Sequence, residues 1–257
     1  MIKVGEKMKK AVLITGASKG TGFAIAEKFA EEGYAVFISS RIKSDVEIAA
    51  EKIKRAYDTY ALGLKIDSES SEDVDKAFLK IKESGFYLDT LVLNAADLGI
   101  NMPILTTDIN DWAHVINTNL VWNFQIVQNA AKIMIKKGGS IIFIGSNTSI
   151  RAIKNRSSYI ASKGGINSLV KALAVELGEY GIRANCVASG SIKTVRWDAL
   201  SYEERQSKQL RVPIRDIADY QDIANAVWFL SGRTAKNITG TVLTVDGGVD
   251  AQLFPHA

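Results

Sequence analysis

The chain has 257 residues, of which 47% are hydrophobic and 23% charged, and its formal net charge is +4. This balance predicts a folded protein with a substantial core and excludes a disordered chain. The positive charges are spread without a basic block, so we expect no nucleic-acid interface. The single cysteine, Cys186, excludes an intrachain disulfide and lies in an apolar run typical of a buried strand. We expect no metal site.

The first ten residues are polar and lack the apolar segment of a signal peptide. No stretch approaches the roughly 20 apolar residues that cross a membrane. We therefore expect a soluble, cytoplasmic protein that does not associate with membranes.

Short apolar runs alternate with longer segments whose apolar residues recur every three or four positions. The expected strands are 11–15, 35–39, 62–66, 90–93, 140–144, 183–187 and 242–245. The expected helices are 23–32, 71–83, 112–135, 159–179 and 222–230. Strands that are apolar throughout are typical of a parallel sheet covered on both faces. The sequence predicts one α/β domain over residues 1–257, a Rossmann-type, doubly wound sheet of seven parallel strands, with a candidate lid at 195–219.

The first expected strand runs directly into a glycine-rich turn, and a helix follows at once. Glycines permit a tight turn and a close backbone approach, while the helix N-terminus offers N–H groups to a pyrophosphate. The spacing Gly-x-x-x-Gly-x-Gly therefore predicts a nucleotide site. The loop residues expected to contact a cofactor are Gly16, Ser18, Lys19, Gly20, Thr21 and Gly22.

The second expected strand ends at Ser40 and Arg41. Folds selective for NAD place an acid here to hold the ribose hydroxyls, whereas an arginine accommodates a 2′-phosphate. Arg41 and Lys19 supply two cations, so the sequence favours NADP(H) over NAD(H). Asp67, at the end of the third strand, is a candidate acceptor for the adenine amino group. It can equally cap the next helix, a role for which Ser68 competes.

Tyr159 and Lys163 lie one helical turn apart and share a face. A phenol titrates near ~10 in water, and both an adjacent ammonium and the positive charge of oxidised nicotinamide favour the phenolate. Tyr159 can thus act as a general acid in reduction and a general base in oxidation, while Lys163 can also bond the nicotinamide ribose. Ser146, after an apolar strand, can hold a substrate oxygen beside Tyr159. Asn119, inside a helix, can position a water that connects Lys163 to solvent.

Together these motifs resemble those of the single-domain short-chain dehydrogenases/reductases, from Ala11 to Gly248. Asn119, Ser146, Tyr159 and Lys163 fall in the order and spacing of that family's catalytic tetrad. The resemblance implies an oxidoreductase acting on a C=O or CH–OH group. The further cofactor contacts that it implies are Asn94, Ala95, Ala96, Ile192 and Thr194, with Tyr159 and Lys163 themselves. The substrate contacts are Thr148, Ser189 and Trp197.

Two positions depart from the family pattern. After the fourth strand Leu93-Asn94-Ala95-Ala96, followed by Asp97, stands where the family has Asn-Asn-Ala-Gly. The lost glycine can alter how closely the backbone approaches the cofactor. Ser189 stands where a proline is usual, which frees φ beside the nicotinamide and adds a hydroxyl to the pocket. Neither change removes a reacting group.

The overall pattern is most similar to that of bacterial 3-oxoacyl-[acyl-carrier-protein] reductases, which implies a ketone substrate on a carrier protein. Sugar, polyol and steroid dehydrogenases share this pattern, so they stay open as alternatives. Basic residues near the active-site mouth dock the carrier protein in the reductases. Lys137 stands at one such position, but Tyr180 occupies the other. The resemblance also implies a homotetramer formed through helices 112–135 and 159–179.

Three other functions are less consistent with these residues. A non-catalytic NADP(H) sensor tends to lose the Tyr159/Lys163 pair. A sugar-nucleotide epimerase or dehydratase needs a larger C-terminal substrate domain than the residues after the seventh strand provide. An enoyl reductase, acting on a carbon–carbon double bond, often has a longer interval between its tyrosine and lysine.

Overall fold

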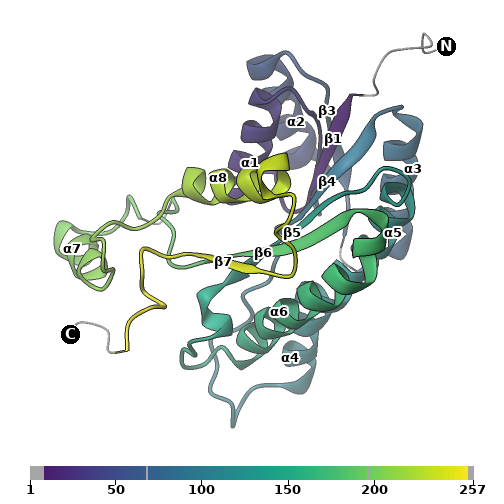
Figure 1. Ribbon diagram of the computed structural model, residues 1–257. Helices are drawn as coiled ribbons and strands as arrows, with labels where there is room; N and C mark the ends of the chain where they lie inside the picture. The colour runs from purple at the N-terminus through teal and green to yellow at the C-terminus, as the bar shows by residue number, and fades with distance from the viewer. Residues whose placement is uncertain (1–8, 68, 196, 254–257) are drawn as a thin grey trace.

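The computed structural model describes residues 9–67, 69–195 and 197–253. Seven strands form one parallel sheet in the order β3-β2-β1-β4-β5-β6-β7 (Figure 1). They are β1 (Lys10–Ile14), β2 (Ala35–Ser40), β3 (Ala61–Lys65), β4 (Tyr87–Leu93), β5 (Gly139–Ser146), β6 (Ile182–Ser189) and β7 (Val242–Val245). The predicted α/β, doubly wound sheet is confirmed, and its strand order reverses between β1 and β4.

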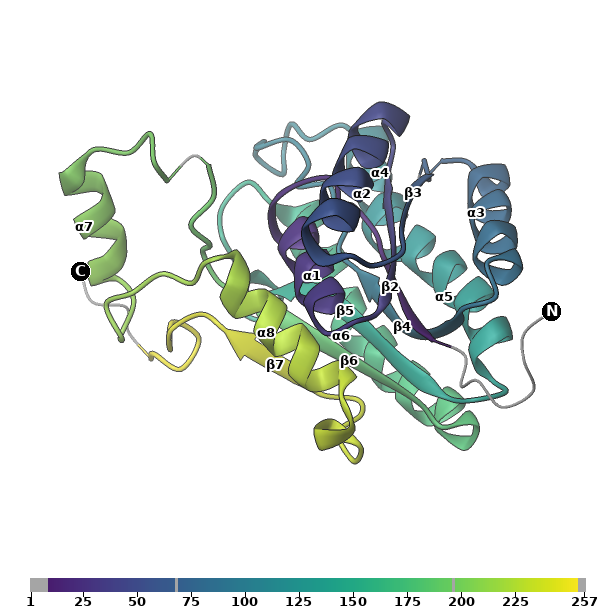
Figure 2. The same ribbon diagram turned by 90° about the horizontal axis from the view of Figure 1, so that it is seen from above.

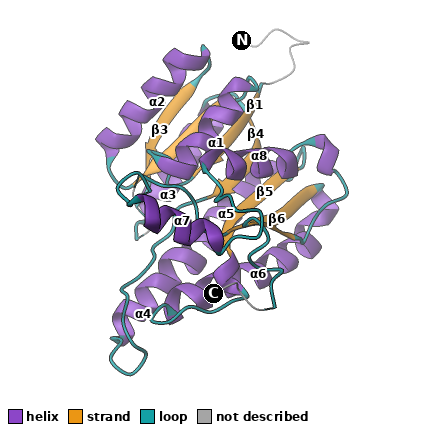
Figure 3. Ribbon diagram, turned by 90° about the vertical axis from the view of Figure 1, so that its left-hand side faces the viewer, coloured by secondary structure: helices purple, strands orange, loops and turns teal. Residues whose placement is uncertain are grey.

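Helices cover both faces of the sheet (Figures 1 and 2). One face carries α1 (Gly20–Glu31), α2 (Lys43–Tyr57) and α8 (Tyr220–Ser231). The other carries α3 (Ser71–Glu83), α5 (Trp122–Met134) and α6 (Ser157–Leu177), with α4 (Ile109–Ile116) packed on α6. A further helix, α7 (Tyr202–Leu210), stands away from the sheet, and Figure 3 views the molecule from its side.

Side chains that alternate along the central strands enter two cores. Leu13 and Phe143 pack under α3, α5 and α6, whereas Ile14 and Ile142 pack under α1, α2 and α8. Because both faces are covered, these strands have no polar face, and they appear in the sequence as continuous apolar runs. Cys186 is fully buried on β6, as predicted, and burial raises the pKa of its thiol to about 11.

Two helices were not predicted. In α2 the buried stripe consists of Val46, Ala49, Ala50 and Ile53, two of them small, within a strongly charged segment. The other, α7, buries no residue, and its sequence is mostly charged and polar. A local signal does mark its start: Ser201 and Glu204 form a reciprocal capping box.

The predicted helix 112–135 is not one regular helix. It is divided into α4, a π-helical turn at Asn117–Val121, and α5. A π-turn shifts the backbone register, which no periodicity in this short segment reveals. Within the described residues, no helix is long and apolar enough to span a bilayer.

Candidate functional site

The reversal of strand order places two loops next to each other at the carboxyl ends of β1 and β4, where α/β sheets commonly bind ligands. The Asn94 carboxamide donates to Thr15 O (3.0 Å) and to Gly16 O (2.9 Å). The backbone N–H groups of Asn94 and Ala95 both donate to the Thr15 hydroxyl, each at 3.0 Å. Four hydrogen bonds therefore fix the loop after β1 against the loop after β4.

A cleft of about 600 Å³ opens over these two loops. Many of the predicted cofactor residues line it: Gly16, Ser18, Lys19, Ser40, Arg41, Asn94, Ala95 and Ala96. Gly20, Thr21 and Gly22 form the first turn of α1. Asp67 is not among the lining residues, and its carboxylate accepts the Glu69 N–H instead. Ser68 lies outside the described residues.

The glycine loop fits a bound pyrophosphate. A Cβ at Gly16 would lie 2.8 Å from Ala95 Cα, and one at Gly22 would lie 2.6 Å from the Asn94 amide nitrogen. Side chains at these positions would therefore collide with the loop after β4. Lys19, at the N-cap of α1, makes no capping bond with its side chain. The N-terminus of α1 is thus available to an anion.

The cleft also carries positive charge. Lys19 of the glycine loop and Arg41 both line it, and Arg41 directly follows Ser40, the last residue of β2. Among the described residues that line the cleft, Asp97 is the one carboxylate, and it belongs to the loop after β4. The end of β2 therefore presents cations where an NAD-selective site would present an acid.

Ser146, Tyr159 and Lys163 come together next to this cleft. Ser146 ends β5 and Tyr159 lies on α6, close enough for the Ser146 side chain to lower the pKa of the Tyr159 phenol. The Lys163 ammonium lies 5.5 Å from the centre of the Tyr159 ring and donates to Ile144 O at 2.7 Å. Thr148 also donates to the Ser146 hydroxyl, from its N–H at 3.2 Å and its side chain at 2.9 Å. A carbonyl oxygen at this position would meet the Ser146 and Tyr159 hydroxyls together.

Burial shapes the acid–base properties of the pair. It raises the pKa of Tyr159, while the hydrogen bond with Ser146 and the charge of Arg156 lower that pKa in part. Burial also lowers the pKa of Lys163 to about 8. Desolvation of the phenol is therefore the largest effect on the pKa of Tyr159.

Asn119 lies in the π-turn between α4 and α5. Its carboxamide donates to Ser162 Oγ (3.0 Å) and to Asp97 O (2.8 Å), and accepts the Asp97 N–H at 2.7 Å. The Ser162 hydroxyl donates in turn to Tyr159 O. The Asn123 side chain donates to Asn119 O at 2.6 Å. Asn119 is thus buried and linked to the helix turn that carries Tyr159 and Lys163.

The remaining predicted cofactor and substrate contacts lie at the end of β6 and in the segment that follows it. Ser189 pairs in register with Ser146 across β5 and β6. Ile192 follows β6 and bridges to Ala218. Thr194 O accepts the Trp197 N–H at 2.7 Å in the segment leading to α7. No contact of the Trp197 side chain with the tetrad is seen among the described residues.

Lys137 lies at the end of the sheet opposite the candidate active site of its own chain. It directly precedes β5, at the amino end of the sheet, where its ammonium lies 4.9 Å from the centre of the Tyr87 ring. Tyr180 precedes β6 at the same end. Ser146 is at the opposite, carboxyl end of β5, so neither residue flanks the site of its own chain.

Several residues that hold the site were not identified from the sequence. Arg156 donates to Leu98 O (3.0 Å) and Gly99 O (2.7 Å). Thr15 and Ser162 carry the bonds described above. Their partners are mostly backbone atoms of distant segments, which leave no residue pattern. The sequence did show Asp97 in an unusual place, directly after the altered family segment.

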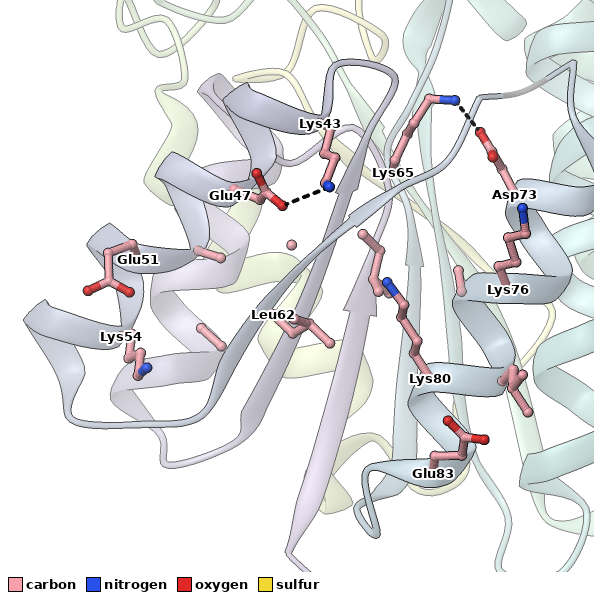
Figure 4. Close-up of a pocket in the computed structure, with 16 residues that line it drawn as sticks. Lys43, Glu47, Glu51, Lys54, Leu62, Lys65, Asp73, Lys76, Lys80 and Glu83 are labelled. Carbon is pink, nitrogen blue, oxygen red and sulfur yellow. Dashed lines mark ion pairs between the residues drawn. The ribbon is translucent and has the colours of Figure 1, made fainter.

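A second hollow, of about 630 Å³, lies over the edge strand β3 between α2 and α3 (Figure 4). Its charged side chains pair with each other, as Lys43 does with Glu47 at 3.7 Å and Lys65 with Asp73 at 3.0 Å. Such paired charges along an exposed edge protect it from pairing with another strand. Among the described residues that line this hollow, none forms a group like that of Ser146, Tyr159 and Lys163. The cleft beside Tyr159 is therefore the candidate active site.

Comparison with known proteins agrees with this geometry. A family model described as Enoyl-(Acyl carrier protein) reductase matches residues 16–250. The 3-oxoacyl-[acyl-carrier-protein] reductase FabG of Staphylococcus aureus is 36% identical over 247 residues, covering 95% of this chain and 99% of its own. The chain belongs to the short-chain dehydrogenase/reductase family. It is accordingly an oxidoreductase.

Other family members agree over a similar span. The 3-oxoacyl-[acyl-carrier-protein] reductase FabG of Aquifex aeolicus is 33% identical and covers 93% of this chain and 97% of its own. Among solved structures, a putative gluconate dehydrogenase from Agrobacterium tumefaciens superposes with a TM-score of 0.88 at 33% identity. That match covers 95% of this chain and 97% of the other. The same fold is thus shared by relatives whose names state different substrates.

The buried ammonium of Lys163 predicts a pH-dependent stability. Because burial holds its pKa near 8, below the 10.5 of an exposed lysine, the unfolded chain binds more protons between these values. Stability contributed by this site is lowest below pH 8 and rises as the pH approaches 10.5. Replacing Lys163→Met removes this dependence. The stability of the wild type relative to the variant should therefore rise by about 2–3 kcal/mol from about pH 7 to about pH 10.

Urea unfolding of both proteins at several pH values measures this change. Lys171→Met, on the exposed side of the same helix, is the matched control and should leave the pH profile unchanged. A difference between wild type and Lys163→Met that stays constant with pH would contradict the buried charge.

Proposed function

We propose that this oxidoreductase uses NADP(H) to reduce a ketone to a secondary alcohol, reversibly, and that its substrate is a 3-oxoacyl thioester. The observation that carries the proposal is the Ser146–Tyr159–Lys163 group beside a cleft that is lined by the glycine loop and by two cations, Lys19 and Arg41. The proposed catalytic residues are Asn119, Ser146, Tyr159 and Lys163, within a single catalytic domain.

Each side chain has a defined task in this proposal. The Ser146 and Tyr159 hydroxyls hold the ketone oxygen, and Tyr159 delivers the proton to it as the alcohol forms. Lys163 holds the ribose and, as an ammonium, stabilises the phenolate that Tyr159 leaves behind. Asn119 orders the path by which that proton is replaced. When bound, the nicotinamide supplies the hydride, which no amino-acid side chain can provide.

NADP(H) is favoured over NAD(H) by the charge at the end of β2. Arg41 provides a planar donor fork suited to a phosphate, and Lys19 of the glycine loop adds a second cation to the lining of the same cleft. The proposed cofactor contacts are the glycine-loop residues, Ser40, Arg41, Asp67, Asn94, Ala95, Ala96, Ile192 and Thr194, with the two helix residues Tyr159 and Lys163.

A 3-oxoacyl thioester is supported by the names of the curated relatives, which are 3-oxoacyl-[acyl-carrier-protein] reductases. The segment 195–219 is the proposed lid, and its exposed Val195, Tyr202 and Leu210 give it an apolar surface suited to an acyl chain. Thr148, Ser189 and Trp197 are the proposed substrate contacts. A sugar-acid substrate is the alternative, favoured by the gluconate dehydrogenase neighbour. Enoyl reduction is favoured only by the description of the family model.

Replacing Tyr159→Phe tests the reaction. The variant keeps the ring but loses the proton donor, so kcat for acetoacetyl thioester reduction should fall by about 10²- to 10⁴-fold. NADPH affinity, measured by the change in its fluorescence, should stay within about two-fold, since the loss of one neutral hydrogen bond is modest. Tyr180→Phe, at the far end of the sheet, is the matched control. Normal turnover by Tyr159→Phe would reject the mechanism.

Replacing Arg41→Ala tests the cofactor. A charge-assisted bond to a phosphate contributes about 1.5–3 kcal/mol, so the KM for NADPH should rise about 10- to 100-fold. The KM for NADH should change little because NADH has no 2′-phosphate. Lys43→Ala, close by on α2 but facing the other hollow, is the control. Equal effects on the two cofactors would show that Arg41 does not read the phosphate.

A homotetramer is also proposed, on the basis of apolar side chains left exposed on the long helices. Val175 on α6 is 83% exposed, and Val121 at the end of the π-turn and Phe124 in α5 are more than two-fifths exposed. Val175→Glu should dissociate the assembly because it would place a charge in an apolar contact. Sedimentation velocity measures this, with the exposed Leu79→Glu of α3 as control. An unchanged sedimentation coefficient would exclude this face as an interface.

A further inference from the structure

Asp97 is the residue that departs from the family pattern, and it holds three elements of the site together. Its backbone N–H and C=O make two of the three hydrogen bonds that orient the Asn119 carboxamide. One oxygen of its own carboxylate accepts the Gly99 N–H at 2.7 Å. The other oxygen faces His114 of α4, with His114 Nε2 at 3.4 Å. The Asp97 side chain thus fixes the turn whose backbone holds Asn119.

His114 also contacts a third segment of the chain. Its other ring nitrogen, Nδ1, lies 3.1 Å from a carboxylate oxygen of Glu69, in the loop between β3 and α3. Both carboxylates are acceptors only, and a neutral imidazole donates from one nitrogen at a time. Only the doubly protonated imidazolium can therefore satisfy Asp97 and Glu69 together.

The charged groups around this contact come from four segments. Glu69 and Asp97 face the imidazole from the two loops, and Asp111 lies one turn earlier on α4. Arg156 faces the same turn from the start of α6 by way of the Leu98 and Gly99 carbonyls. In the described parts of the chain, neither Glu69 nor Asp97 has an ion pair with any other cation.

We propose that Asp97 is a positioning residue, which fixes Asn119 through the turn at Asp97–Gly99, and that protonation of His114 tightens this hold. The inference rests on the proposed function, since Asn119 serves the proton path of that reaction. Neither Asp97 nor His114 exchanges a proton with the substrate. Their effect is on how well Asn119 is held when the proton at Tyr159 is replaced.

The pH dependence follows from ordinary histidine chemistry. Acid favours the doubly protonated imidazolium and alkali the neutral ring, so the two contacts of His114 are complete in acid and incomplete in alkali. His114→Gln lacks the charge in both conditions, whereas His114→Arg keeps it in both. Comparing each variant with the wild type at the same pH removes the titration of Tyr159 and Lys163 from the result.

The kinetic experiment measures kcat at saturating NADPH for wild type, His114→Gln and His114→Arg. The ratio of wild type to His114→Gln should be about 2- to 5-fold at about pH 6 and close to one at about pH 8.5, the range for a partly exposed ion pair. The ratio of His114→Arg to His114→Gln should be the same at both pH values. The KM for NADPH should not change. A pH-independent ratio for the wild type would overturn the proposal.

A second measurement does not depend on turnover. The Asp97 amide donates to Asn119, so its hydrogen exchange reports the hold directly. At about pH 6 the Asp97 amide should exchange faster in His114→Gln than in wild type. In the double variant Asp97→Asn/His114→Gln, exchange of the same amide should be little faster than in His114→Gln. Equal exchange in wild type and His114→Gln would overturn the inference. If the wild type reduces no ketone, the proposed function fails, while this exchange result still decides the role of Asp97.

Discussion

The bonds between Asn94 and the turn at Thr15–Gly16 hold together the two loops at which the sheet reverses its strand order. A parallel sheet with helices on both faces leaves few places where a ligand can reach the strand ends, and the reversal point is one of them. Fixing these loops allows α1 to begin at Gly20 with its N-terminus facing the cleft. It also places the turn at Asp97 directly over Asn119.

The polar groups near Tyr159 are buried, and each is paired with a neighbour. Asn119, Ser162 and Lys163 are almost inaccessible to solvent, and their bonds end on the carbonyls of Asp97, Tyr159 and Ile144. Burying such groups is unfavourable unless they are paired, so the network selects one arrangement of β5, α6 and the π-turn. The same burial changes the pKa values of Tyr159 and Lys163, which links the packing of the core to the acid–base chemistry.

The sheet could be predicted because strands covered on both faces are apolar throughout, and the four proposed catalytic residues could be predicted because their spacing follows a family pattern. The rest depends on features that leave little pattern in the sequence. The helix α2 buries a narrow stripe rich in alanine, and α7 buries nothing. The π-turn at Asn119 packs, with α4, against α6, which is a contact between segments distant in the sequence. Arg156 and Asp97 act through backbone atoms of distant segments, and no residue type identifies such partners.

The most direct test follows the hydride. When NADPH carrying deuterium at the transferred position of C4 reduces a 3-oxoacyl thioester, the deuterium should be recovered on the carbinol carbon C3 of a 3-hydroxyacyl product, as seen by NMR and mass spectrometry. The same label should not move in Tyr159→Phe. If 3-oxoacyl thioesters gave no labelled alcohol, and deuterium were instead taken up by an enoyl thioester to give a saturated chain, the proposed ketone reduction would be wrong.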